Sequence, residues 1–274
     1  IDPAHASFLH RFFDDETDDD GYGQQFRFST EENSVAITKV LRENDCPEID
    51  CEQTETGLRI FALRPLNDKE IHVRVTNQIF PNAVVIPISN EIMLTQWHVA
   101  IDNTRSWWYA IFSSFTEPVD KEKMRKDRLE LYTLPDYLPR KNRSNEYGYD
   151  AEEQRTQTYT GMGMDINVHD QWAVESLGTI QDRTLEHLGT TDKVIIANRK
   201  ILIQAIKAHK NNLKSEDISF RGDQNNQRGP VTIDTIVPMA TWQTSWKKTA
   251  GERRRNSSWA KPITAIQGMK AANK

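Results

Sequence analysis

Two histidines and one aspartate are the residues of this sequence whose types could bind a catalytic metal. His5 and His10 lie in the segment DPAHASFLH, and Asp170 follows far downstream in the segment VHDQW. Two imidazoles and one carboxylate form the facial triad of non-haem Fe(II) sites, which leaves coordination positions open for dioxygen and substrate. The carboxylate also offsets one of the two positive charges of the ion. The residue types therefore predict a mononuclear iron site.

The spacing of the two histidines constrains their local structure. On a regular α-helix, a step of five residues turns the second side chain about 140° away from the first. Convergence on one metal therefore requires a π-bulge or an unwinding, and π-bulges are common at functional sites. In the alternative interpretation, both histidines are ordinary surface or core residues, and Asp170 is only a negative charge in the first turn of a helix. His169 competes with Asp170, but neighbours on a helix point about 100° apart, so only one can face the metal.

A run of strand-like segments is the predicted scaffold for these residues. β-branched and aromatic residues separated by turn residues recur along the first half of the chain and predict an antiparallel meander. These segments are residues 58–63, 71–75, 83–88, 92–101 and 106–115. Turns are expected at 81–82 and at 102–104. Such a sheet needs helices to cover its apolar face.

The second half of the chain is predicted to supply those helices. Helical periodicity covers residues 119–131, 168–188 and 192–211. Three tryptophans near the end of the chain predict a further, C-terminal helix. We therefore divide the chain into a catalytic iron domain of residues 1–212 and a polar C-terminal extension of residues 213–274 that contains the terminal helix.

Composition narrows the class of protein. The chain has 274 residues, of which 37% are hydrophobic and 27% charged, and it can bury a sizeable core. Its net charge of -5 argues against nucleic-acid binding, which needs a surplus of Lys and Arg. No apolar stretch approaches the roughly 20 residues that span a bilayer, and no signal peptide is recognisable. We therefore expect a cytoplasmic protein that binds neither nucleic acid nor membrane.

Two features of the sequence concern redox state and completeness. Cys46 and Cys51 have the wrong interval for a CxxC redox or zinc pair, so they are predicted to be free thiols. The chain begins at Ile1 without a methionine and enters a motif at once. We interpret it as a fragment that lacks an N-terminal part.

The segment DPAHASFLH resembles the D-x2-H-x4-H iron motif of Rieske non-haem iron oxygenase alpha subunits. The segment DINVHDQWAVESLGTIQDRTLEHLG is similar to the region of phthalate-dioxygenase-like members that supplies the ligand aspartate. The resemblance implies that His5 and His10 are the imidazole ligands and that Asp170, rather than His169, is the carboxylate ligand. It also implies the α+β helix-grip fold (lipid-transfer or Bet v 1-like), in which an antiparallel sheet wraps around helices and encloses the iron site and a cavity.

The resemblance implies a separate catalytic role for Asp2. In the family, an aspartate at this position hydrogen-bonds to the first histidine ligand and to a cluster-binding histidine of the neighbouring subunit, which gives a short electron path. The alternative is a helix N-cap. The C-x-H and C-x2-H ligands of a Rieske 2Fe-2S cluster do not occur in this sequence. The cluster is therefore expected on a missing N-terminal domain, supplied by a neighbouring subunit of a homotrimer or a dimer of trimers.

The implied function is that of an oxygenase that activates dioxygen at Fe(II). It would hydroxylate or O-demethylate an aromatic compound, such as an aromatic acid or an aryl ether, with electrons that a reductase or ferredoxin delivers through the Rieske cluster. Two alternatives remain: a cofactor-free hydrophobic-ligand-binding module of the same fold, and a zinc hydrolase with the same three ligands. Substrate contacts are expected at sheet positions taken to face inward, namely His72, Arg74, Trp97, Trp108 and Phe112.

Overall fold

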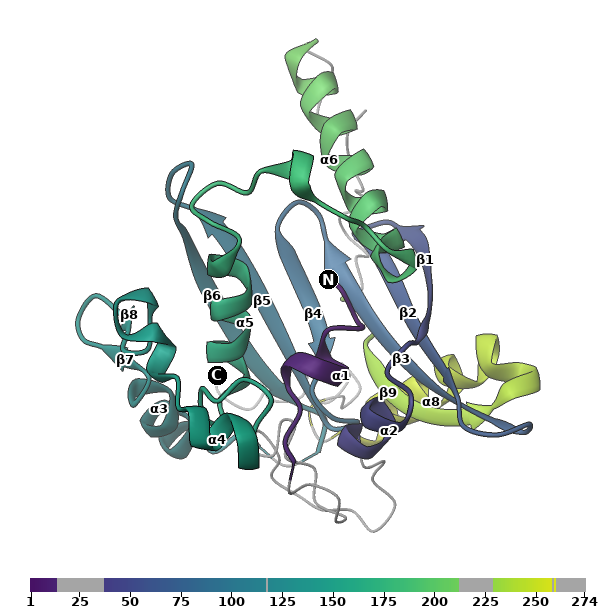
Figure 1. Ribbon diagram of the computed structural model, residues 1–274. Helices are drawn as coiled ribbons and strands as arrows, with labels where there is room; N and C mark the ends of the chain where they lie inside the picture. Colours follow the sequence, from purple (N-terminus) through teal and green to yellow (C-terminus); the bar gives the residue numbers. More distant parts are fainter. Residues whose placement is uncertain (14–36, 117, 212–228, 258, 260–274) are drawn as a thin grey trace, which may run out of the picture.

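The chain folds around one antiparallel sheet, seen in a computed structural model that describes residues 1–13, 37–116, 118–211, 229–257 and 259. Six strands lie in the order of the sequence, β1 to β6, and β9 pairs with β3 beside β4 (Figure 1). The strands are β1 (Glu48–Thr54), β2 (Gly57–Pro65), β3 (Glu70–Ile79), β4 (Ala83–Pro87), β5 (Ile92–Ala100), β6 (Ser106–Ser114) and β9 (Ile233–Pro238). The predicted α+β class and the antiparallel meander are confirmed.

Strand β3 shows how the sheet separates two layers of side chains. Val73 and Val75 are fully buried and pack with Trp246 of α8 (Trp242–Asn256) on one face. His72 alternates with them, and its side chain points to the opposite face because successive residues of a strand face opposite sides. One face of β3 is therefore an apolar core under α8, and the other carries buried polar groups.

Three helices cover the face of the sheet to which His72 points. They are α1 (Ala6–Leu9), α5 (Ile166–Ser176) and α6 (Lys193–Lys210). One apolar cluster joins Ala6 and Ile166 to Leu94 of β5, and another joins Val194 of α6 to Ile60 of β2. Figure 1 shows α1 and α5 in front of the sheet, with the far end of α6 running beyond it.

The remaining elements are short and lie around this core. They are α2 (Ile37–Glu43), α3 (Lys121–Leu129), α4 (Ala151–Thr156) and the small hairpin of β7 (Tyr132–Thr133) and β8 (Leu138–Pro139). In the part of the chain with described coordinates, no helix is long and apolar enough to cross a membrane. Cys46 and Cys51 are free thiols, as predicted.

The helix predicted at 168–188 is much shorter than expected. It ends at Ser176, and Gly178 follows with a φ of 95°, a conformation that glycine adopts without strain. The residues beyond Gly178 form bends and two short 3-10 turns instead of further α-helix. The helices predicted at 119–131, at 192–211 and near the C-terminus are present as α3, α6 and α8.

The predicted C-terminal extension contributes directly to the sheet. β9 and α8 both lie within residues 213–274, and β9 pairs with β3 from Glu70 to Val75. This strand was not predicted, although the run TIDTIV is rich in β-branched residues. The boundary at residue 212 stays a prediction, because residues 212–228 and 260–274 lie outside the described residues.

Candidate metal centre

His5 and His10 flank a single helical turn. Helix α1 has four residues, with His5 at its N-terminal cap and His10 at its C-terminal cap. The backbone of His10 has already left the helical conformation, with φ -104° and ψ 30°. The two imidazoles therefore approach each other, and their ring centroids lie 5.2 Å apart. The unwinding that the five-residue spacing requires occurs at His10.

Asp170 approaches the two histidines from helix α5. The start of α5 is fixed by Asp165, whose carboxylate caps the helix and pairs with Arg128 of α3. Asp170 Oδ1 lies 3.4 Å from His5 Nε2 and 3.2 Å from His10 Nε2. One ligand atom from each of the three residues thus falls within 4.8 Å of the others.

These distances suit a single first-row metal ion. Two ligands at right angles about an ion, with bonds of about 2.1 Å, lie about 3.0 Å apart. The separations of 3.2 and 3.4 Å require only a small adjustment to reach that value. The side chain of His10 is 2% exposed, whereas His5 is 39% and Asp170 is 27% exposed. The site is therefore anchored in the core on one side and accessible on the other.

The main chain of Asp2 orients His5. Nδ1 of His5 donates to the carbonyl oxygen of Asp2, because a carbonyl can only accept. In the neutral imidazole, this leaves the lone pair of His5 on Nε2, the atom nearest Asp170. The carboxylate of Asp2 accepts a hydrogen bond from the Ala4 N–H at 2.8 Å and so stabilises the turn before α1. The contact of Asp2 with His5 is thus made by the backbone.

The pKa shifts of Asp170 and His10 favour metal binding, whereas the shift of His5 opposes it. Burial would raise the pKa of Asp170, but the charges and hydrogen bonds of His10 and His5 outweigh it and hold the pKa well below its usual range. Burial lowers the pKa of His10. For His5, the hydrogen bond and charge of Asp170 outweigh burial and raise the pKa. An ionised carboxylate and neutral imidazoles are the forms that bind a metal, so loading the site would release protons from His5.

His169 lies behind His10 and not among the three converging residues. Its ring is fully buried, and its Nδ1 lies 3.3 Å from Nδ1 of His10. Its Nε2 lies 2.8 Å from the carbonyl oxygen of Gly163. Burial, and then the charge of His10, lower the pKa of His169 to about 4. The sequence suggested His169 only as a competitor of Asp170, and its contact with His10 was missed.

His72 and Arg74, two of the expected substrate contacts, both bind Asp234 of β9. Nε2 of His72 and Nη1 of Arg74 each contact one oxygen of the Asp234 carboxylate, and all three side chains are buried. Burial would raise the pKa of Asp234, but Arg74 and His72 outweigh it and lower the pKa to about 2. These polar groups are therefore engaged with a residue of the chain itself, which the sequence did not reveal because β9 was missed.

The three aromatic candidates divide between the two faces of the sheet. Phe112 packs against the cluster of α1 and α5, and Trp108, four residues earlier in β6, points to the same face. Trp97 pairs with Tyr109, and the alternation along both strands places these two side chains on the opposite face. The expectation that Trp97 faces the metal side is therefore corrected.

His98, which the sequence did not single out, lies on the sheet face that packs against α1 and α5. It is paired with Trp108 across β5 and β6, and the two rings stack with centroids 5.2 Å apart. Burial, and then the charge of the chain's N-terminus, lower the pKa of His98, and the charge of Asp170 opposes that shift. Nε1 of Trp108 is buried without a hydrogen-bond partner among the described residues.

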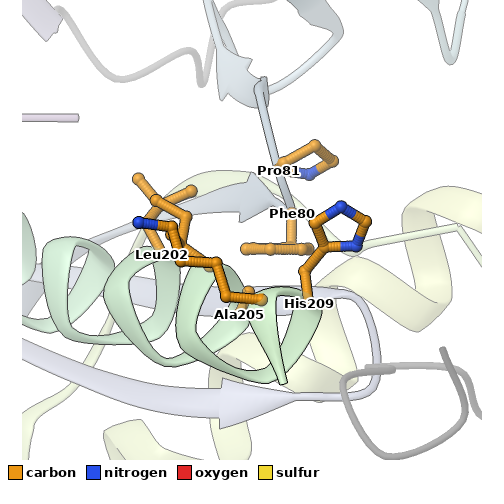
Figure 2. Close-up of a pocket in the computed structure, with 7 residues that line it drawn as sticks. Phe80, Pro81, Leu202, Ala205 and His209 are labelled. Carbon is orange, nitrogen blue, oxygen red and sulfur yellow. The ribbon is translucent and has the colours of Figure 1, made fainter. Parts of the chain in front are cut away.

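Two surface hollows lie away from these residues. One, between the β3–β4 turn and the end of α6, is lined by apolar side chains and two basic ones (Figure 2): Phe80, Pro81, Leu202, Ala205, Ile206, His209 and Lys210. The other lies beside Trp246 of α8. Neither is lined by a residue of the converging triad. The cavity expected at the metal centre stays a prediction.

The chain is similar to oxygenase subunits of two aromatic dioxygenases. Over 172 residues it is 27% identical to the phthalate 4,5-dioxygenase oxygenase subunit of Pseudomonas putida. This alignment covers 59% of this chain and 38% of that protein. Over 233 residues it is 24% identical to the 3-chlorobenzoate-3,4-dioxygenase oxygenase subunit of Comamonas testosteroni. This alignment covers 77% of this chain and 50% of that protein. The chain spans about half the length of the curated relatives it matches, or less.

The sequence model of one protein family matches nearly the whole chain. Its match extends over residues 1–265 and so includes the His5 and His10 segment, the helix of Asp170 and strand β9. The relationship to Rieske-type oxygenase subunits that the iron motif predicted is confirmed. The chain belongs to the family described as LigXa C-terminal domain like.

Proposed function

We propose that this chain is the catalytic domain of a Rieske-type oxygenase and that His5, His10 and Asp170 bind a mononuclear Fe(II). The observation that carries the proposal is the convergence of two imidazoles and one carboxylate within 4.8 Å, in a chain similar to aromatic dioxygenase subunits. Bound iron would supply the reductive activation of dioxygen. A cofactor-free binding module has no use for this convergence.

The substrate of the proposed reaction is an aromatic compound, either an aromatic acid or an aryl ether, which is hydroxylated or O-demethylated. The stacked rings of His98 and Trp108, on the sheet face that packs against α1 and α5, offer a flat wall for an aromatic ring. The indole N–H of Trp108 can donate a hydrogen bond to a polar substituent of that ring, since no described residue accepts it.

The antiparallel sheet behind α1 and α5 supports assignment to the helix-grip class.

Loading the site with Fe(II) tests the proposal. We expect the wild-type chain, reconstituted under anaerobic conditions, to bind one Fe(II), and Asp170→Asn to bind it at least about 10-fold more weakly, because the amide is nearly isosteric but neutral. Asp182→Asn, which changes an exposed aspartate, is the matched control. If the wild type binds no Fe(II), the hydrophobic-ligand-binding module is favoured. If it binds only Zn(II), the hydrolase is favoured.

The electrons of the proposed reaction would come from a Rieske 2Fe-2S cluster on a neighbouring subunit of a homotrimer or a dimer of trimers, reduced by a reductase or ferredoxin. Asp2 is the proposed bridge between that cluster and His5. One oxygen of its carboxylate accepts a hydrogen bond from the Ala4 N–H, and its main-chain carbonyl accepts one from His5. The second carboxylate oxygen is therefore the group that would face a histidine of the partner subunit.

Asp2→Asn separates this bridge from the metal site. Asparagine keeps the main-chain carbonyl and an acceptor for the Ala4 N–H, so iron content and stability are expected to equal those of the wild type. In the complete oligomer, single-turnover oxidation of the reduced cluster, with substrate and dioxygen present, is expected to slow at least about 10-fold. A rate equal to that of the wild type would leave Asp2 a structural residue of the turn.

A further inference from the structure

A line of hydrogen bonds runs from the protein interior to the back of His10. It begins at Gly163, whose carbonyl oxygen lies 2.8 Å from Nε2 of His169. It continues from Nδ1 of His169 to Nδ1 of His10, at 3.3 Å. It ends at Nε2 of His10, which lies 3.2 Å from Asp170. Each of the four ring nitrogens therefore has a polar atom beside it.

The acceptor at the inner end of this line sets the position of the protons. A carbonyl oxygen can only accept, so Nε2 of His169 carries a hydrogen. His169 is fully buried, and it contacts Gly163, His10 and the ring of Phe12, none of which is a carboxylate. Its imidazole is therefore neutral, with a lone pair on Nδ1. The hydrogen between the two Nδ1 atoms therefore belongs to His10. This leaves Nε2 of His10 as the atom that can offer a lone pair to a metal.

The Gly163 carbonyl is held in place by the loop around it. Gly163 has a φ of 86°, and its N–H donates to Oε1 of Glu153 at 2.7 Å. The same oxygen accepts from the Thr158 hydroxyl at 2.7 Å. A Cβ at Gly163 would lie 2.8 Å from Nζ of Lys141, so glycine also suits the close approach of that side chain.

The backbone of the His10 segment is tied to the same loop. Phe12 and Thr158 form a β-bridge, and Phe13 N–H donates to the Gln157 carbonyl at 2.7 Å. The ring of Phe12 packs against His169, with centroids 6.1 Å apart. The His10 segment and the Gly163 carbonyl are therefore both tied to the loop of residues 157–163.

We propose that His169 is a positioning residue of the metal centre, which fixes the tautomer and the ring orientation of His10 by accepting its Nδ1 hydrogen and donating to the Gly163 carbonyl. The inference rests on the proposed function, since it assigns a partner to one of the proposed ligands. Hydrogen-bonding partners of this kind orient metal-binding histidines and raise their affinity. His5 receives the equivalent fixation from the Asp2 carbonyl.

The tautomers can be read in the metal-free chain. In long-range proton–nitrogen correlation spectra of the protein with 15N-labelled histidine, at pH 7 to 8, we expect His169 to be protonated at Nε2 only and His10 at Nδ1. Assignments follow from His169→Gln and from His187→Ala, an exposed histidine. A hydrogen on Nδ1 of His169, or a bare Nδ1 on His10, overturns the proposal.

Metal affinity tests the consequence of this arrangement, with Co(II) alone as the probe and its visible absorption as the signal. His169→Leu removes both hydrogen bonds and is expected to weaken Co(II) binding by about 10- to 100-fold. His169→Gln can accept and donate in the same two directions and is expected to restore binding to within a few-fold of the wild type. Thermal unfolding without metal shows whether each variant folds.

The outcomes separate this inference from the metal centre itself. Equal affinity in His169→Leu and the wild type overturns the positioning role, and so does an equal loss in the Leu and Gln variants, which would assign the effect to ring packing. A wild-type chain that shows the expected tautomers but binds no Co(II) or Fe(II) contradicts the proposed metal centre and leaves the hydrogen-bond line intact. Should His169→Leu not fold, the tautomers of the wild type still decide.

Discussion

Replacing His10 with alanine is expected to abolish Fe(II) binding under conditions in which the wild-type chain binds one ion. The remaining His5 and Asp170 can supply only two ligands, so the facial arrangement and its anchor in the core are both lost. The affinity for Fe(II) should fall by more than about 100-fold. Losing only a residue that is hydrogen-bonded to a metal ligand costs up to about 100-fold, and losing the ligand itself should cost more. Iron content after anaerobic gel filtration measures the effect.

A control is needed because His10 is buried. His187→Ala removes an exposed histidine and should retain the wild-type iron content. Thermal unfolding of metal-free His10→Ala shows whether the fold survives the loss of the ring beside His169. Iron retained at the wild-type level in a folded His10→Ala chain would show that His10 is not a ligand.

Replacing Asp234 with asparagine is expected to lower the free energy of unfolding by about 3 kcal/mol at pH 7. The substitution removes the negative charge that faces Arg74 and His72, both of which stay buried. The loss also loosens the link between β9 and β3, since Asp234 pairs directly with Arg74 across the two strands. Urea unfolding followed by tryptophan fluorescence measures the difference.

The effect of Asp234→Asn should depend on pH in a definite direction. The pKa of Asp234 is about 2 in the folded chain, below its ordinary value of 3.8. A carboxyl group with a lowered pKa stabilises the folded state fully above its ordinary value, and this stabilisation is lost as the pH falls toward 2. The difference between the two values corresponds to about 2 kcal/mol.

The difference between wild type and Asp234→Asn should therefore shrink from about 3 kcal/mol at pH 7 to about 1 kcal/mol near pH 2. Asp136→Asn, at an exposed position, should show little difference at any pH. A loss of stability that stays constant between pH 7 and pH 2 would mean that the charge of Asp234 is not what stabilises the pairing of β9 with β3.

The sequence alone determined strands β2 to β6 of the sheet and the types of the candidate ligands. Strands β2 to β6 follow from runs of β-branched and aromatic residues between turns, a local pattern with a period of two. His5, His10 and Asp170 were selected by residue type and by resemblance to an iron motif, and the structure brings them together. Asp170 could be preferred to His169 only through that resemblance, since both lie at the start of the same helix.

Only the tertiary structure decided which polar residues meet. Residues of one strand alternate between faces, so Trp97 and Trp108 separate although both were expected to face inward. His72 and Arg74 are engaged by Asp234, and His169 bonds to His10, through pairs more than 150 residues apart in the chain. No local pattern encodes such pairs, because they depend on strand register and on the packing of α5 against α1. The sequence determined which groups could bind a metal, and long-range packing decided which groups support them.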